Sequence, residues 1–315
     1  MMIQGWQAQC VCPKGQPLPA ALSELAPQTP LTTLGHDIET LALLGTQFED
    51  ALITTRNDGA VISGRGGYGR LQSRDHSFTV NARRVNLRFC PGAPLQLARH
   101  APERGQPGAV VAIDAGGQIH HRVQYITEHD SRVAASLRPE PAHLPALPEA
   151  APGNVVSLGA VRAARQSWEA STSAGHLDDL MGDQGRSRRR MLPCLGTERA
   201  WQVIPRMLPG FLETLRRRGA NVTRMVPGGG VLQAQSGVFR RVARMDGIVL
   251  CQAARSDFAL DMNRVASVWV AASRLHWQLE AYDDQHRAVA ALCALPLSCG
   301  RDWRDALLSL PRAPC

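Results

Sequence analysis

The chain has 315 residues, of which 44% are hydrophobic and 20% are charged, the balance of a globular protein with room for two domains. It contains no run of about 18 apolar residues, which excludes a helix that spans a membrane. Its first residues lack the basic segment and the apolar core of a secretory signal, so we expect a cytoplasmic protein.

The net charge of +8 comes almost entirely from arginine, because Lys14 is the only lysine. A bias in codon use explains this composition, and so does an anionic ligand, since arginine pairs with carboxylates and keeps its charge when partly buried. We do not expect nucleic acid as a partner, because the basic residues form no stripe with interleaved aromatic residues. The cysteines are scattered without a CxxC pair, which is typical of buried thiols.

Hydrophobic periodicity predicts the same order of elements in both halves of the chain. In the first half we expect a helix over residues 36–50 and strands over 51–55, 85–89, 110–113 and 119–125. In the second half we expect a helix over 204–218 and strands over 221–226, 231–235, 258–262, 267–271, 277–282 and 288–295. No structure is assigned to residues 1–30.

Residues 138–154 contain five prolines, which precludes a continuous helix and predicts a linker. A polar helical stretch follows over about 155–190. The halves correspond at an offset near 170, since the turn after Asp114 matches the turn after Asp283. We therefore predict an α+β fold, a tandem duplication of a large antiparallel β-sheet domain flanked by helices.

The predicted division places the first repeat at 1–137, the proline-rich linker at 138–154, and the linker helices with the second repeat at 155–315. Short motifs from residue 38 to residue 311 resemble, in order and spacing, those of the haemin-degrading factor family of the HemS/ChuX type. They lie at residues 54–61, 85–89, 113–121, 257–260, 267–270, 279–283 and 303–311. The chain is thus identified as a divergent two-repeat member.

The resemblance implies a haem held between the second repeat and the linker helices, with a histidine on one helix as ligand of the haem iron. Without a gap, the ligand position falls on Gly175, and His176 follows it. One residue turns a helical side chain by about 100°, so His176 is either the ligand after a local shift or an exposed histidine in a degraded site.

The resemblance also implies that Arg88 reaches the haem, as a distal donor or as a partner of a propionate. The residue pattern agrees, because Arg88 lies on the strand face opposite Leu87 and Phe89. The alternative is a solvated strand arginine. No Ser/His/Asp set and no paired carboxylates are visible, so the catalytic residues stay unassigned.

The resemblance implies a cytoplasmic haem-binding protein of a haem uptake and iron acquisition pathway, which traffics haem. Haem degradation of the haem oxygenase type occurs in the family, and whether this chain is an enzyme stays open. The implied partners are haem and either an uptake transporter or a haem oxygenase. The alternatives are a non-enzymatic haem carrier or regulator, and an interaction protein that no longer binds haem.

Overall fold

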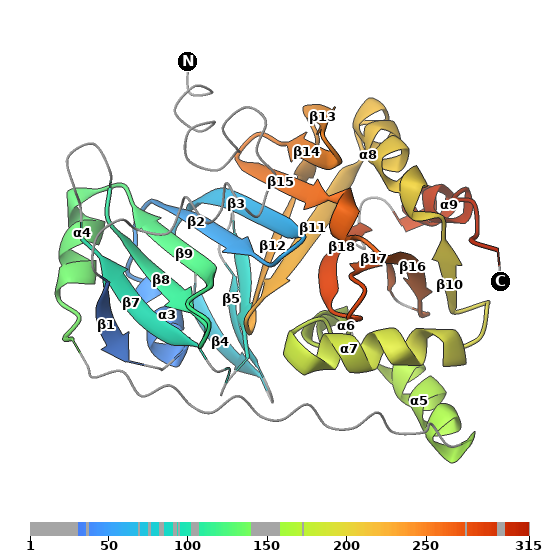
Figure 1. Ribbon diagram of the computed structural model, residues 1–315, viewed down its shortest axis with the longest axis horizontal. Helices are drawn as coiled ribbons and strands as arrows, with labels where there is room; N and C mark the ends of the chain where they lie inside the picture. The colour runs from blue at the N-terminus through green and yellow to red at the C-terminus, as the bar shows by residue number, and fades with distance from the viewer. Residues whose placement is uncertain are drawn as a thin grey trace.

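The computed structural model places two large antiparallel sheets side by side, with helices packed on them (Figure 1). The described residues are 31–35, 38–68, 70–74, 77–81, 85–90, 93, 95–101, 107–139, 158–171, 173–274, 276–294 and 300–314. The segment 1–30 and most of the predicted linker lie outside these ranges.

Each sheet has nine strands. In spatial order the first sheet consists of β1 (Thr32–Gly35), β7 (Gln96–His100), β8 (Ala109–Ile113), β9 (Ile119–Tyr125), β2 (Ala51–Arg56), β3 (Ala60–Gly66), β15 (Ser256–Asp261), β14 (Ile248–Gln252) and β13 (Arg241–Met245). The second consists of β10 (Ala200–Val203), β16 (Ser267–Ala272), β17 (Trp277–Tyr282), β18 (Ala288–Ala294), β11 (Asn221–Gly228), β12 (Val231–Val238), β6 (Asn86–Phe89), β5 (Ser77–Asn81) and β4 (Arg70–Arg74).

The two halves of the chain exchange strands. Strands β13–β15 of the second half extend the first sheet, where Val61 of β3 lies opposite Ala259 of β15. Strands β4–β6 of the first half extend the second sheet, where Leu232 of β12 lies opposite Arg88 of β6. The sequence divides near residues 138–154, but each sheet contains strands from both sides of that division.

The first six strands have the same spatial order in both sheets. In the first sheet this order is β1, β7, β8, β9, β2 and β3, and in the second sheet the strands numbered nine higher take the same places, as β10, β16, β17, β18, β11 and β12. The exchanged strands β15, β14 and β13 correspond in the same way to β6, β5 and β4. The α+β fold with two large antiparallel sheets and flanking helices is therefore confirmed.

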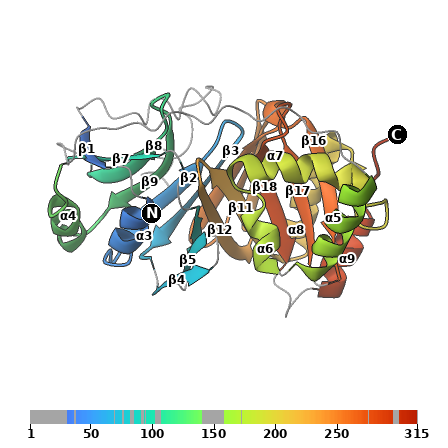
Figure 2. The same ribbon diagram turned by 90° about the horizontal axis from the view of Figure 1, so that it is seen from below.

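Helices cover the second sheet on both faces (Figures 1 and 2). The α-helices within the described residues are α3 (Ile38–Gly45), α4 (Glu128–Ala135), α5 (Leu158–Ala170), α6 (Ser173–Asp178), α7 (Gly182–Met191), α8 (Leu208–Arg217) and α9 (Gly300–Leu308). Trp168 of α5 belongs to a core cluster with Trp269 of β16, whereas Phe211 of α8 belongs to another with Val268. Since successive strand residues point to opposite faces, α5–α7 cover one face and α8 the other.

The predicted strands coincide with or overlap observed strands, and the stretch 155–190 is helical as α5–α7. Strand β11 runs to Gly228, and the turn into β12 lies at Gly229 and Gly230, whose positive φ values of 57° and 103° favour glycine. The sequence analysis did not assign β1, β3, β4, β5, β7, β10, β13, β14, α4 and α9. The four cysteines within the described residues are free thiols; Cys251 and Cys293 are buried, as predicted, whereas Cys90 and Cys194 are partly exposed.

A buried polar network joins the two sheets at His121 of β9. Tyr68 Oη lies 2.6 Å from His121 Nε2, and Thr55 Oγ1 lies 2.7 Å from His121 Nδ1. Because Thr55 donates to Gln233 Oε1 of the second sheet, its oxygen accepts from Nδ1–H and Nε2 accepts from the tyrosine. The neutral imidazole is thus fully hydrogen-bonded, and burial lowers the pKa of His121 to about 3.

Protonation of His121 should destabilise the fold in acid. The unfolded chain binds the proton below about 6.5, the ordinary histidine pKa, whereas the folded chain binds it only near pH 3. The contribution of the neutral His121 to the free energy of unfolding is therefore complete above pH 6.5. It decreases by about 1.4 kcal/mol per pH unit as the pH falls towards 3. Between about pH 7 and about pH 5, urea unfolding should show a loss of stability that is about 2 kcal/mol larger in the wild type than in His121→Gln. An equal loss in both proteins would contradict this assignment.

Candidate functional site

His176 lies inside the protein, between helix α6 and the second sheet. Its side chain is 1% exposed, and its ring stacks on His276 at 5.5 Å and lies 4.5 Å from the ring of Trp168. The expectation that His176 could be an exposed histidine is therefore wrong. The helix directs this side chain towards β17, which contributes Gln278, the hydrogen-bond partner of His276.

A buried ion pair beside His176 fixes helix α7 to strand β17. Arg188 Nη2 donates to Glu280 Oε1 at 2.6 Å, and Arg188 Nε lies 3.1 and 3.0 Å from the two carboxylate oxygens. Gln278 and Tyr282 also donate to this carboxylate. Burial acts to raise the pKa of Glu280, but the charge and hydrogen bonds of Arg188 outweigh it, so the pKa lies below its ordinary value.

The same arginine sets the state of the His176 ring. Arg188 Nη1 lies 3.3 Å from His176 Nδ1 and can only donate, so Nδ1 accepts and the neutral ring carries its proton on Nε2. Nε2 is buried and has no hydrogen-bond partner among the described residues. Burial, followed by the charge of Arg188, lowers the pKa of His176 to about 3. The imidazole is therefore neutral near pH 7.

Arg88 lies at the edge of the same region. Its Nη1 donates to Asp178 Oδ1 at 2.6 Å, and Asp178 ends α6 two residues after His176. Their side chains are 14% and 29% exposed. The structure thus places Arg88 against the end of the short helix that carries His176, and Arg88 is an ion-paired residue rather than a solvated strand arginine.

Aromatic side chains and arginines line the rest of this face. The guanidinium of Arg188 lies 4.4 Å from the ring centroid of Trp168, and that of Arg189 lies 4.6 Å from the ring of Trp269. Trp269 Nε1 is buried without a hydrogen-bond partner in the described part of the chain. These contacts are typical of cation–π stacking.

Sequence reasoning missed Arg188, Glu280 and His276 as neighbours of His176. One signal was present, because β17 carries Gln278, Glu280 and Tyr282 at alternate positions and so presents polar groups on one face. Their partners come from helices about 90 residues away, as in the 92-residue separation of Arg188 and Glu280. No local pattern encodes that distance.

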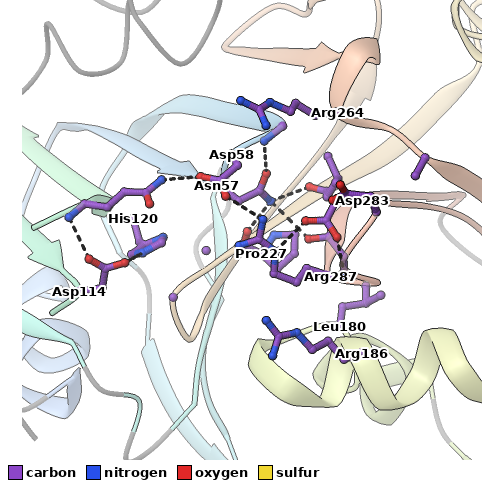
Figure 3. A pocket seen from close by; sticks show the side chains of 18 of the residues that line it. Asn57, Asp58, Asp114, His120, Leu180, Arg186, Pro227, Arg264, Asp283 and Arg287 are labelled. Carbon is purple, nitrogen blue, oxygen red and sulfur yellow. Dashed lines mark hydrogen bonds and ion pairs between the residues drawn. The ribbon is translucent and has the colours of Figure 1, made fainter. Parts of the chain in front are cut away.

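A separate polar cleft of about 380 Å³ lies where the two halves meet (Figure 3). The corresponding turns of both repeats line it, with Asp114 and His120 on one side and Asp283 and Arg287 on the other. His120 Nε2 lies 2.8 Å from Asp114 Oδ2. Leu180, in the turn between α6 and α7, also lines the cleft, but its lining includes neither His176 nor Arg88.

The polar groups of the cleft are largely paired with one another (Figure 3). Asn57 Nδ2 donates to the Pro227 carbonyl at 2.7 Å and to the Val289 carbonyl at 2.8 Å, which ties the turn after β2 to the second sheet. Arg287 donates to Asp58 and to Asp283. We interpret the cleft as the polar junction between the repeats.

Within the described ranges, no group of three or more histidine, cysteine and carboxylate side chains is arranged to hold a metal ion. In the same ranges, no helix has the length and apolar character that crossing a membrane requires.

Neither the family models nor the curated proteins contain a match to this chain. Solved structures do match over nearly the whole length. The crystal structure of apo-PhuS, a haem-binding protein from Pseudomonas aeruginosa, aligns with a TM-score of 0.75 and 18% identity and covers 93% of each chain. Holo-PhuS aligns at 0.74 with 20% identity over 90% of this chain and 87% of that one.

ChuS, described as a haem oxygenase of E. coli, aligns with a TM-score of 0.72 and 18% identity, over 89% of this chain and 88% of its own. The agreement extends over both sheets and therefore includes both halves of the chain. The chain has the two-repeat fold that PhuS and ChuS share.

Proposed function

We propose that this chain binds haem between helices α6 and α7 and the second sheet, with His176 as the axial ligand. The observation that carries the proposal is the convergence of a neutral buried imidazole and Arg88 on one face of a fold that the haem-binding protein PhuS also has.

The residues present fit haem in kind. Haem requires an axial donor, cations near its propionates and aromatic or apolar cover. His176 supplies an imidazole whose Nε2 has no partner, Arg88 and Arg189 supply cations, and Trp168 and Trp269 supply aromatic faces. This donor set supports haem as the ligand.

The present arrangement is the closed form of that site. His176 is 1% exposed, so α6 must move away from the sheet before a ligand can reach the ring. Iron binding through Nε2 also requires Arg188 to leave Nδ1, so that the ring proton can reside there. Bound haem supplies the redox chemistry, whereas the chain orients it and excludes water.

A haemin titration of the purified protein tests the proposal. We expect a saturable Soret band in the wild type and a shifted, weaker band in His176→Ala, because the axial nitrogen is lost. His129→Ala serves as the control, since His129 is exposed on α4 and lies in the first half. If haemin does not bind saturably, the haem proposal is contradicted, and the alternative of an interaction protein that no longer binds haem is favoured.

Within haem binding, we propose a role in intracellular haem trafficking. Ring opening is the second candidate, favoured by the shared fold with ChuS. Adding ascorbate to the haem-loaded protein and following the Soret band distinguishes them. A stable band supports a carrier, and progressive loss with release of iron supports degradation.

A further inference from the structure

We propose that the carboxylate of Asp178 binds Arg88 at the position where a propionate of a bound porphyrin would otherwise bind. By competing for Arg88, Asp178 lowers the affinity of the site for porphyrins that carry free propionates. This inference rests on the proposed haem function. It assigns to Asp178 the role of a specificity-determining residue that competes with the ligand.

The position of Arg88 follows from the exchanged strand β6. Arg88 lies directly opposite Leu232 of β12, and residues opposite each other on paired strands project from the same face. Leu232 belongs to the core cluster that contains Leu180 and Trp269 beneath α6 and α7. The side chain of Arg88 therefore emerges on the face where the ligand is proposed to bind.

Asp178 reaches this arginine from the end of α6. Its Oδ1 lies 2.6 Å from Arg88 Nη1, and both side chains are partly shielded from water, with exposures of 29% and 14%. Its negative charge also acts on the neighbouring Cys90 thiol and, after burial, raises the pKa of that thiol. The carboxylate thus lies against β6.

A propionate and an aspartate side chain present the same group to a guanidinium. Arginine binds a carboxylate through directed N–H donors, and two carboxylates at one such position repel each other. A porphyrin propionate therefore has to displace Asp178 before it can bind Arg88.

Iron-free porphyrins test the inference without involving the axial ligand. Protoporphyrin IX carries free propionates and its dimethyl ester does not, and quenching of tryptophan fluorescence reports binding of either. In Asp178→Asn we expect the dissociation constant for protoporphyrin IX to fall about fivefold, because the competing charge is gone. The dissociation constant for the ester should not change.

Two further variants complete the design. Glu213→Gln removes a carboxylate that pairs with Arg216 on α8, on the other face of the sheet, and should leave both dissociation constants unchanged. Arg88→Gln combined with Asp178→Asn should abolish the tightening, because the shared cation is absent. Urea unfolding of Asp178→Asn verifies that the fold is retained.

Each outcome bears on one claim. Equal or weaker binding of protoporphyrin IX by Asp178→Asn overturns the role of Asp178 and leaves haem binding standing. Equal tightening for the ester overturns it too, since the effect would then be a general opening of α6. If neither porphyrin binds any variant, both the inference and the proposed function fail.

Discussion

Replacing Arg188 by methionine should lower the free energy of unfolding by about 3–5 kcal/mol, as expected when one partner of a buried ion pair is removed. Arg188 is 3% exposed and Glu280 is fully buried, so the variant leaves a carboxylate without its counter-ion in the interior. Gln278 and Tyr282 continue to donate to it, but neither carries a charge. Urea unfolding followed by tryptophan fluorescence measures the loss.

The matched controls separate the charge from the packing. In Arg188→Met combined with Glu280→Gln, no charge is left unpaired, and we expect at least half of the lost stability to return. Arg190→Met alters an exposed arginine of the same helix and should change stability by less than about 0.5 kcal/mol. A double variant as unstable as the single one would show that the guanidinium contributes through packing on Trp168.

Neither half of the chain should fold alone. A fragment of residues 155–315 lacks β4–β6, so β12 becomes an exposed sheet edge. A fragment of residues 1–137 lacks β13–β15, so β3, which still pairs with β2, becomes an exposed sheet edge. We expect each fragment to show poor dispersion in amide NMR spectra and a tendency to aggregate. Mixing the two fragments during refolding should restore the far-ultraviolet and fluorescence spectra of the intact chain.

The intact chain provides the companion measurement. Leu87 of β6 lies in the second sheet, but its side chain packs in a core cluster of first-half residues that also includes Val231 of β12, so Leu87→Ala should destabilise both halves together. Its unfolding should remain a single transition with a lower midpoint. Two separate transitions, or an independently folded fragment, would show that the halves are autonomous domains.

Hydrophobic periodicity located most of the elements because alternation and helical spacing are local properties of the chain. The duplication is also visible in the sequence, because the turns at Asp114 and Asp283 are local patterns that recur at a fixed offset. Both turns line the same cleft. Strand β13 was not predicted because it is half exposed and rich in arginine, so apolar and polar residues alternate only weakly along it. Its neighbour β14 was not predicted either.

The candidate site was partly accessible from the sequence. Arg88 was placed on the polar face of its strand by alternation, and His176 was selected through a resemblance of short motifs. The side-chain orientation of His176 could not be predicted, because it depends on the register of a six-residue helix against a sheet. Packing against Trp168 and His276 decides that register.

The sequence by itself determined the α+β class and the duplication, since both follow from local pattern, whereas the two candidate residues came from the resemblance of short motifs to a family. Only the tertiary structure decided that the halves exchange three strands, and this exchange places Arg88 of the first half beside Asp178 of the second. The physical reason is that pairing between strands 90 residues or more apart depends on which sheet edges remain unpaired when the core has folded. The availability of an edge is a property of the assembled sheets, and no short segment of sequence encodes it.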